Sequence, residues 1–424
     1  IATCKIGLES VVSLELRRLG IEVEKVEDAR VLFLGDYQTM AKACLWLRTA
    51  ERVLMEVASF EARSFEELFQ GVKAVSWRDY LKKDSFIHVN GKSAKSTLFS
   101  VSDCQRIAKK AIVENLMAAY RTERLPETGG EVIIEIGILR DVVTVALDCC
   151  GAGLSRRGYR TYNVAAPIAE TLGAAMLLLS HYRGDRPLID PMCGSGTMPI
   201  EAAMIANNMA PGLNRPFAAE EWEFAGGKSL FDRARQEARE SRIDGRPDIL
   251  GSDIDARSID LCKKHAKKAG VMVNWKVAPL KELSTDKSGG LIVCNPPYGE
   301  RMMEKREAEV LYREMRHNYE QLNEWGKADG IEVAMEKLRR CACEALQTEE
   351  IVVENIDDEK TVQTLSRSYQ AQEDEFLKRA VMMAAGRRAG KQGGAALPLS
   401  GDEVRRKIEA AKAQMDTGAY RRRG

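Results

Sequence analysis

The sequence has no long apolar run and no closely spaced metal-binding motif. No stretch of about 18 uncharged apolar residues occurs, so no segment is long enough to span a membrane as a helix. The chain has 10 cysteines but no CxxC pattern, and only 4 histidines. Because zinc sites and disulfide frameworks need regular Cys or His spacing, we expect neither a metal nor a disulfide network. Reduced thiols in a cytoplasmic protein are the simpler expectation.

The chain also has almost no net charge. Its 64 Lys and Arg residues are balanced by 63 Asp and Glu residues, which leaves +1. The total charge therefore neither favours nor excludes nucleic acid as a partner, and only local clusters of basic residues can indicate one. The chain begins at Ile1 without a charged and then apolar leader, so we expect a trimmed protein rather than a secreted one.

What the sequence does contain falls into parts of different character. Its 424 residues exceed one ordinary domain, so two or three domains are expected. Residues 1–60 combine short apolar strands with helical stretches. Residues 61–151 contain a strand, a Lys/Ser-rich loop, a long amphipathic helix and a hairpin that turns at Arg140–Asp141. We therefore predict an α+β module over 1–151 rather than a parallel sheet.

From residue 152 onward, apolar runs end in loops rich in Gly, Asp or Pro. The three runs are PLIDPMCGSG, PDILGSDID and GLIVCNPPYG, with helical segments between them. Strands that alternate with helices predict an α/β domain with a parallel, doubly wound sheet, which binds its ligand at the carboxyl ends of the strands. A Pro-, Gly- and Trp-rich insertion, 210–247, separates the first two strands. After about residue 327 the chain becomes polar and helix-prone, and its role stays open.

The loop DPMCGSGT, at 190–197, has the features of a cofactor site. Gly194 and Gly196 allow a tight turn and the close approach of a ligand, and the helix that follows directs free N–H groups at that ligand. A dinucleotide site would have a third glycine, but Pro199 stands at that position. A tight strand–helix turn without any ligand is the alternative at this stage.

The acidic residues around this loop favour a cationic ligand. The carboxylate of Asp190 attracts a sulfonium or an amine and repels a pyrophosphate. Asp253 or Asp255, at the end of the next predicted strand, can bind ribose hydroxyls. We therefore predict S-adenosylmethionine rather than NAD as the cofactor.

The sequence Asn-Pro-Pro-Tyr at 295–298 predicts chemistry on the exocyclic amine of a nucleobase. Such an amine is a poor nucleophile because its lone pair is delocalised into the ring. The side-chain oxygen of Asn295 and the carbonyl of Pro296 can each accept one N–H bond and so turn the lone pair toward a methyl donor. Tyr298 offers a ring on which a base taken out of its stack can lie. The candidate catalytic residues are Asn295, Pro296, Pro297 and Tyr298; a plain strand terminator would explain only the prolines.

Several segments resemble the THUMP-domain RNA methyltransferases, in the same order along the chain. They are GLSRRGYRTYNVAAPIAETLGAAM, LIDPMCGSGTMPIEAAMIANNMAPGLNR, GSDID and NPPYGER, and GKSAKSTLFSVSDCQRIAKKAIVENL is similar to the RNA-binding core of THUMP domains. Within the family the similarity is greatest to bacterial enzymes that methylate N2 of a guanine in 23S rRNA. The resemblance implies a ferredoxin-like piece over 1–60, a THUMP domain over 61–151 and a Rossmann-like methyltransferase domain over 152–326. Residues 327–424 have no counterpart.

The resemblance also implies a set of cofactor contacts. Asp190, Gly194 and Gly196 would face the methionine end of S-adenosylmethionine, and Asp253 would bind its ribose. The candidate cofactor-binding residues are Asp190, Gly194, Ser195, Gly196, Thr197, Asp253 and Asp255, with Pro167 and Thr171 from the segment that leads into the site. The chain departs from the family at Pro279, where the family usually has an Asp that binds the adenine amine.

Two groups of basic residues flank the predicted site. They are Lys92, Lys95, Lys109 and Lys110 around the predicted THUMP loop and helix, and Arg156, Arg157 and Arg160 before the methyltransferase domain. Any one of them alone would be ordinary surface charge, but as clusters they predict phosphate contacts. Phosphate contacts do not identify the target, so RNA is the predicted partner, with rRNA favoured and tRNA open.

The residues and the resemblance together predict an S-adenosylmethionine-dependent RNA methyltransferase that acts on N2 of a guanine in 23S rRNA. Asn-Pro-Pro-Tyr does not distinguish this amine from N6 of adenine in RNA or DNA, and only the resemblance favours guanine. A non-catalytic RNA-binding or ribosome-assembly protein with a degenerate methyltransferase fold is a further alternative, because of Pro279 and the unmatched C-terminal region.

Overall fold

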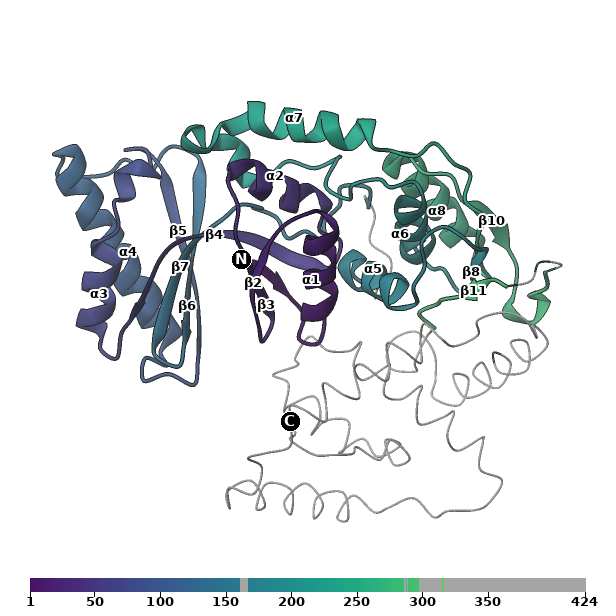
Figure 1. The fold of residues 1–424 in the computed structure, drawn as a ribbon, viewed down its shortest axis with the longest axis horizontal. Helices are drawn as coiled ribbons and strands as arrows, with labels where there is room; N and C mark the ends of the chain where they lie inside the picture. Colours follow the sequence, from purple (N-terminus) through teal and green to yellow (C-terminus); the bar gives the residue numbers. More distant parts are fainter. Residues whose placement is uncertain (161–166, 286, 288, 297–314, 316–424) are drawn as a thin grey trace, which may run out of the picture. The chain divides into compact units, whose positions relative to one another are not determined.

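The computed structural model describes residues 1–160, 167–285, 287, 289–296 and 315 (Figure 1). Within these residues the chain forms two compact units. The first unit contains 1–160, 169–171 and 207–245, and the second contains 167–168, 172–206 and the described residues from 246 onward. Each unit is built on a sheet of its own.

The first unit has a seven-stranded sheet. Its strands are β1 (Ala2–Cys4), β2 (Val23–Glu27), β3 (Arg30–Phe33), β4 (Ala50–Glu61), β5 (Phe86–Ala94), β6 (Glu131–Leu139) and β7 (Val142–Asp148). Its helices before residue 151 are α1 (Glu9–Arg18), α2 (Tyr37–Trp46), α3 (Phe65–Lys73), the 3-10 turn η1 (Trp77–Asp79) and α4 (Val101–Tyr120). The strand order is β2-β3-β1-β4-β7-β6-β5, and β5 and β6 are the one parallel pair. The predicted α+β module is confirmed.

The long strand β4 joins the two halves of this sheet. Its beginning pairs with β1, and its residues from Leu54 to Glu61 pair with β7. Backbone hydrogen bonds therefore continue across the predicted boundary between 1–60 and 61–151. The two segments share one sheet through β4, and the domain boundaries themselves stay a prediction.

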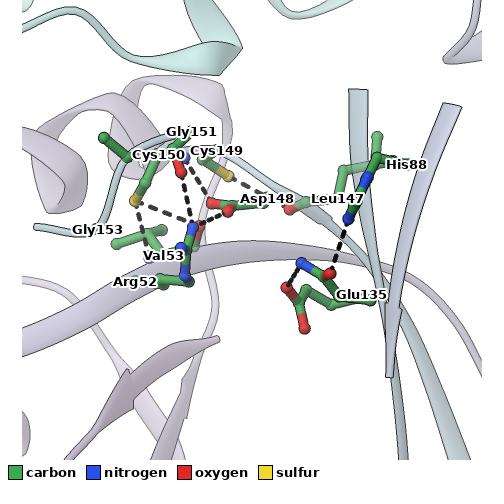
Figure 2. Close-up of polar contacts among 12 residues, drawn as sticks. Arg52, Val53, His88, Glu135, Leu147, Asp148, Cys149, Cys150, Gly151 and Gly153 are labelled. Atoms are coloured by element: carbon green, nitrogen blue, oxygen red, sulfur yellow. Dashed lines mark hydrogen bonds and ion pairs between the residues drawn. The ribbon is translucent and has the colours of Figure 1, made fainter. Parts of the chain in front are cut away.

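A buried ion pair fastens the end of β7 to β4 (Figure 2). Asp148 is fully buried, and its carboxylate accepts from the guanidinium of Arg52 and, at 2.8 Å, from the N–H of Cys150. Arg52 also donates to the carbonyl of Gly151 at 2.8 Å. Burial raises the pKa of Asp148, and the positive charge of Arg52 acts against that rise. These bonds fix the chain at the point where it leaves the sheet.

Local sequence signals explain where several elements begin and end. The turn between β6 and β7 consists of Arg140 and Asp141, which both have positive φ angles, 51° and 65°, as a two-residue hairpin turn requires. The hairpin predicted at this position is confirmed. Helix α3 begins with a capping box, in which Ser64 Oγ accepts from the Glu67 N–H at 3.2 Å and the Glu67 carboxylate accepts from the Ser64 N–H at 3.1 Å.

Residues 207–245 pack on the first unit, although in sequence they interrupt the sheet of the second. They contain the 3-10 turns η2 (Ala218–Glu221) and η3 (Glu223–Ala225) and the helix α7 (Gly227–Glu240). The buried guanidinium of Arg215 donates to the carbonyls of Cys150, Ala152 and Gly153. The N–H of Gly212 donates to the carbonyl of Leu45 in α2 at 2.9 Å. The insertion seen in the sequence is therefore a strap over the N-terminal unit.

The second unit has a four-stranded sheet. Its strands are β8 (Leu188–Asp190), β9 (Ile249–Asp253), β10 (Asn274–Val277) and β11 (Leu291–Ile292), and its helices are α5 (Glu170–Leu179), α6 (Thr197–Ala206), α8 (Ala256–Ala269) and the 3-10 turn η4 (Leu280–Glu282). The order is β10-β9-β8-β11, and every pairing in the described part of this sheet is parallel. The predicted α/β domain with a parallel sheet is confirmed.

The core of the second unit lies around β8 and β11 and under α8. Helices α6 and α8 pack against each other, α6 contacts β8 and β9, and α8 contacts β9 and β10. One buried cluster is formed by Ile189, Leu280, Ile292, Cys294 and Met315, and another by Cys193, Ile259 and Cys262 with Trp275 packed against it. The sheet is thus held so that the carboxyl ends of β8, β9 and β11 lie side by side.

Candidate functional site

The glycine-rich loop 191–196 lies at the carboxyl end of β8, between the strands β9 and β11. The three residues of β8 are all buried, and α6 begins at Thr197 directly after the loop. The N–H of Cys193 donates to the carbonyl of Ser252 in β9 at 2.9 Å, so the loop is bonded to the end of the neighbouring strand. In an open parallel sheet, the carboxyl ends of the strands are the usual place for a ligand.

The two glycines of the loop are needed for different reasons. Both have positive φ angles, 54° at Gly194 and 82° at Gly196, which other residues rarely adopt. A Cβ on Gly196 would lie 2.9 Å from the ring of Trp275 and 3.0 Å from the sulfur of Cys262, so the packing of the protein excludes a side chain there. A Cβ on Gly194 would meet nothing within 4 Å. Gly194 therefore leaves open space beside the loop, where a ligand can approach the backbone.

Asp253 connects the loop to the end of β9. Its carboxylate accepts the N–H of Gly194 at 2.9 Å with one oxygen and the N–H of Asp255 at 3.0 Å with the other. The structure thus brings together residues that lie 59 positions apart in the sequence. Because a carboxylate has about four acceptor positions, Asp253 can still accept hydroxyl groups of a ligand. Asp255 begins α8 as its N-cap, and it accepts from the N–H of Arg257 at 3.0 Å, which lowers its pKa.

Asp190 is a buried carboxyl group at the end of β8. It is only 1% exposed, and one of its oxygens accepts from the N–H of Met192 at 3.2 Å. Burial raises the pKa of Asp190, and the negative charge of Asp253 raises it further. No Lys or Arg of the described chain forms an ion pair with either carboxylate. A positively charged ligand group beside the loop would offset the cost of this buried charge.

Helix α8 holds the loop with two side chains that the sequence does not reveal as part of the site. The thiol of Cys262 donates to the carbonyl of Gly194 at 3.2 Å. Three residues further on, the fully buried His265 places Nδ1 3.1 Å from the carbonyl of Ser195. The hydroxyls of Ser195 and Thr197, both buried, lie 3.4 Å apart. Spacing by three residues puts two side chains on one helix face, but the sequence does not show which loop that face meets.

Exposed apolar side chains stand beside the acidic ones. Ile254, between Asp253 and Asp255, is 74% exposed, and Val277, which pairs with Asp253 in the register of β9 and β10, is 52% exposed. Apolar side chains at neighbouring strand ends suit a flat apolar ligand group. The signal in the sequence is the isoleucine between two aspartates. Pro279, two residues after Val277, is the N-cap of η4.

Asn295 and Pro296 follow β11, which pairs with β8. The strand extends as a buried run through Cys294, and the N–H of Val293 donates to the carbonyl of Ile189 at 3.1 Å. Asn295 is half-buried and Pro296 is buried. The structure therefore places the first half of Asn-Pro-Pro-Tyr at the strand end next to the glycine loop. Pro297 and Tyr298 lie outside the described residues.

Three family models match consecutive parts of the chain. They are a ferredoxin-like domain of the RlmL type over residues 1–54, a THUMP domain over 62–148 and an RMKL-like methyltransferase domain over 157–363. A Bacillus subtilis (strain 168) protein named "Putative RNA methyltransferase YpsC" is 46% identical over 330 residues, which are 77% of this chain and 85% of that protein. The chain belongs to the THUMP-domain RNA methyltransferase family.

Solved structures of similar proteins share this fold. A Listeria monocytogenes protein, described as a predicted N6-adenine-specific DNA methylase, is 46% identical with a TM-score of 0.73, over 76% of this chain and 86% of its own. A second protein, described as "a putative methyltransferase complexed with SAH", is 44% identical with a TM-score of 0.71 over the same shares of the two chains, 76% and 86%. The fold of this THUMP methyltransferase is thus that of a protein crystallised with the demethylated cofactor.

Other relatives are longer than this chain. Ribosomal RNA large subunit methyltransferase K/L of Marinomonas sp. (strain MWYL1) is 34% identical over 339 residues, and the matched part is 46% of that protein. The corresponding protein of Syntrophotalea carbinolica is 36% identical over 332 residues, again 46% of its length. This THUMP methyltransferase therefore spans less than half of the K/L proteins that it matches.

The two predicted residues of the segment before the sheet have different surroundings. Thr171 is fully buried, and its hydroxyl donates to the carboxylate of Glu51 at 2.7 Å within the first unit. Pro167 is half-buried. Neither residue has a described contact with the glycine loop, so their assignment to the cofactor stays a prediction.

The predicted RNA-binding residues of this THUMP methyltransferase are not equivalent. Lys92, Lys95 and Arg156 are exposed. Lys109 pairs with Glu127 at 3.1 Å, Lys110 pairs with Glu114 at 3.8 Å, and Arg160 lies 3.4 Å from Glu170. Arg157 is only 2% exposed, and its guanidinium donates to the carbonyls of Leu154, at 2.8 Å, and of Arg48. The exposed residues are available to phosphate, whereas the bonds of Arg157 hold the chain after β7.

The described residues contain neither a cluster of metal ligands nor a membrane-spanning helix. No group of three or more His, Cys, Asp or Glu side chains there could hold a metal ion. No helix in the same part of the chain is long and apolar enough to cross a membrane.

Proposed function

We propose that this chain transfers the methyl group of S-adenosylmethionine to N2 of a guanine in 23S rRNA. The observation that carries the proposal is the position of two loops at neighbouring strand ends. The glycine loop follows β8, and Asn295 and Pro296 follow β11, its pairing partner. The first loop suits a cationic methyl donor and the second suits a planar amine, and methyl transfer requires both groups to meet.

The residues around the glycine loop fit S-adenosylmethionine. When bound, the cofactor supplies an electrophilic methyl group on a positively charged sulfur. The buried carboxylate of Asp190, without a cationic partner in the described chain, favours a positive group next to it. Gly194 leaves room for close approach, and Asp253 has acceptor positions left for ribose hydroxyls.

Apolar side chains of this chain would hold the adenine of the cofactor. Ile254 and Val277 are exposed at the ends of β9 and β10, beside Asp253. With proline at position 279, the side chain that binds the adenine amine in related enzymes is missing. Packing between Ile254 and Val277 supplies binding energy in its place, roughly 25 cal/mol for each Å² of apolar surface covered.

The target amine is held by the second loop. The side-chain oxygen of Asn295 and the carbonyl oxygen of Pro296 accept its two N–H bonds, which turns the nitrogen lone pair away from the ring plane and toward the methyl group. To Tyr298 we assign the ring on which the flipped base stacks, and to Pro297 the restriction of loop motion that a proline ring imposes. The amine proton is lost to water after the transfer, and no further side chain is needed for that step.

RNA phosphates are contacted by the exposed basic residues. We assign this role to Lys92, Lys95 and Arg156. Lys109 and Lys110 can join them by exchanging their carboxylate partners for phosphate oxygens. The guanidinium of Arg157 stays with its two carbonyl acceptors and positions the chain after β7 within the first unit.

The choice of N2 of guanine, and of 23S rRNA, rests on the resemblance to rRNA methyltransferases and on the K/L relatives. A second candidate, N6-methylation of adenine, is favoured by the description of the Listeria structure. Mass spectrometry of nucleosides from rRNA, tRNA and DNA, with and without the gene, distinguishes the two. A non-catalytic protein would leave every modified nucleoside unchanged.

The decisive variant is Asn295→Ala in the full chain. It removes one of two amine acceptors and leaves the glycine loop and Asp253 intact, so S-adenosylmethionine should bind as before while methyl transfer falls about 10²-fold or more. Asn274→Ala is the matched control. Asn274 is an exposed amide at the amino end of β10, whereas the two loops of the site lie at the carboxyl ends of the strands. Full activity in Asn295→Ala would contradict the proposed mechanism, and unmodified rRNA in both parent and variant would contradict the proposed substrate.

A further inference from the structure

Phe99 is the most exposed large apolar side chain in the described part of the chain, at 84%. It lies in the loop between β5 and α4, directly after Leu98, which is buried. Burying a phenylalanine normally stabilises a protein by about 1.5–3 kcal/mol. A fully presented ring therefore gives up folding energy that the loop could have gained, and it offers both of its faces to a partner.

The loop that presents Phe99 is held by several hydrogen bonds. The hydroxyl of Ser93 donates to the carbonyl of Leu98 at 2.5 Å, and the hydroxyl of Ser96 donates to the carbonyl of Ala94 at 2.8 Å. The N–H of Thr97 donates to the carboxylate of Asp141 at 2.6 Å, and Ser96 Oγ accepts from the Asp141 N–H at 3.1 Å. The ring is thus displayed by a braced loop, tied to the turn of the β6–β7 hairpin.

The same hairpin turn brings positive charge to the loop. Arg140 is exposed, and its N–H donates to the carbonyl of Ala94 at 3.3 Å, so it lies beside the exposed Lys95. Neither cation has an ion pair in the described chain. Two other arginines nearby are neutralised, Arg63 by Asp141 at 3.6 Å and Arg106 by Asp103 at 2.6 Å. Lys95 and Arg140 are therefore the cations of this loop and turn that no carboxylate of the described chain pairs with.

We infer that this tip of the THUMP segment binds an unpaired nucleotide of the RNA, with its base stacked on Phe99 and its neighbouring phosphates held by Lys95 and Arg140. An aromatic face can stack only on a base whose own face is free, which excludes a base inside a duplex. Charge without an aromatic ring would serve any nucleic acid, but the combination is specific for a single strand. The inference rests on the proposed function, because it takes RNA as the substrate.

The test is binding of the full-length protein to a fluorescent single-stranded RNA oligonucleotide and to a duplex of the same length. Phe99→Ala should weaken single-strand binding about 5- to 150-fold, the range that one lost base–aromatic stack gives, and leave duplex binding unchanged. Phe99→Trp should restore it. Because Phe99 is exposed, its removal opens no cavity, and an unchanged melting temperature confirms an intact fold.

Phe86→Ala is the matched control. Phe86 begins β5, eight residues or about 26 Å from Ala94 at the other end of the same strand, and the ammonium of Lys109 lies 5.8 Å from its ring centre. This variant should keep the parent's ratio of single-strand to duplex affinity, because Lys109, which the ring of Phe86 contacts, is assigned to phosphates and not to a base. If it loses as much single-strand affinity as Phe99→Ala, the effect is general to the domain and the inference is wrong.

Salt dependence separates the roles of the ring and the cations. Lys95→Ala and Arg140→Ala should each lower the slope of log affinity against log salt by about 0.7, the value for one phosphate contact on a single strand. Phe99→Ala should leave this slope unchanged. Equal single-strand affinity in parent and Phe99→Ala would refute the inference alone, even if rRNA is methylated. Phe99-dependent RNA binding by a chain that methylates no RNA would refute the proposed function alone.

Discussion

The two glycines of the loop after β8 provide the sharpest test of where the cofactor binds. Gly194→Ala and Gly196→Ala add the same single carbon at two positions with positive φ, 54° and 82°. The backbone strain of an alanine in the left-handed region is about 1–2 kcal/mol at either position. The surroundings of the added carbon differ, because at Gly196 it meets Trp275 at 2.9 Å and Cys262 at 3.0 Å, whereas at Gly194 it meets nothing within 4 Å.

The two variants should therefore differ in stability. Overpacking of a filled core costs a further ~1–3 kcal/mol, so Gly196→Ala should lower the unfolding free energy by about 2–5 kcal/mol. Gly194→Ala should lower it by only about 1–2 kcal/mol. Urea unfolding followed by tryptophan fluorescence measures both values.

Gly194→Ala, the less destabilising of the two variants, should nevertheless weaken cofactor binding. The carbon added in Gly194→Ala occupies the open side of the loop, so calorimetric titration should find the affinity for S-adenosylmethionine at least about tenfold lower, or about 1.4 kcal/mol. Gly289→Ala is the control, since Gly289 also has a positive φ, 69°, and open space around it, but lies before β11. It should lose as much stability as Gly194→Ala and no affinity. Equal affinity in these two variants would refute the placement of the cofactor at this loop.

Three further variants test the site and the fold. His265→Ala removes the bond to the Ser195 carbonyl, so S-adenosylmethionine affinity measured by calorimetry should fall about tenfold, and unchanged affinity would show that α8 does not position the loop. Burial raises the pKa of Glu15, so the native chain keeps a proton that the unfolded chain releases above about pH 4.3. The stability contributed by Glu15 is therefore complete at low pH and falls as the pH rises through the raised pKa. In urea unfolding from about pH 4 to about pH 8, the free energy of unfolding of Glu15→Gln should rise relative to that of the parent. A difference that stays constant with pH would contradict this. Arg215→Met leaves several buried carbonyls without their donor and should cost at least about 3 kcal/mol in urea unfolding, while a loss below about 1 kcal/mol would show that the strap is not held by this residue.

The parts of the site that could be predicted are those encoded by strand ends. Asp190 and Asp253 each close an apolar run, and parallel strands bring their carboxyl ends together, so the pattern predicts that the two strand ends meet; the bond from Gly194 to Asp253 is a detail that only the structure gives. The hairpin at Arg140–Asp141 was predictable because a two-residue polar turn between alternating strands has few geometries. The information for the hairpin lies within a few residues, and that for the strand ends lies in the repeat of one local pattern, an apolar run closed by an Asp.

The parts that could not be predicted depend on contacts between distant segments. The burial of Arg157 is invisible in the sequence, because an arginine in a basic run has the pattern of surface charge until its carbonyl acceptors are known. The role of His265 depends on which loop faces α8. The insertion was recognisable by its composition, but only Arg215 and Gly212, bonded to residues 150–153 and to Leu45, reveal the unit to which it belongs.

The strap has a consequence for the order in which the protein forms on the ribosome. The N-terminal sheet is complete once residue 148 has been made. The strap that packs on this unit, residues 207–245, follows only after β8 and α6. At a synthesis rate of about 5–20 residues per second, the ~85 residues from 160 to 245 take roughly 4–17 seconds. During this interval the backbone carbonyls of 150, 152 and 153 lack the guanidinium of Arg215, and helix α2 lacks its contact with α7. The nascent N-terminal unit therefore stays incomplete until residue 245 has been made, after only the first strand of the methyltransferase sheet, and pauses in translation before that point would lengthen its exposure.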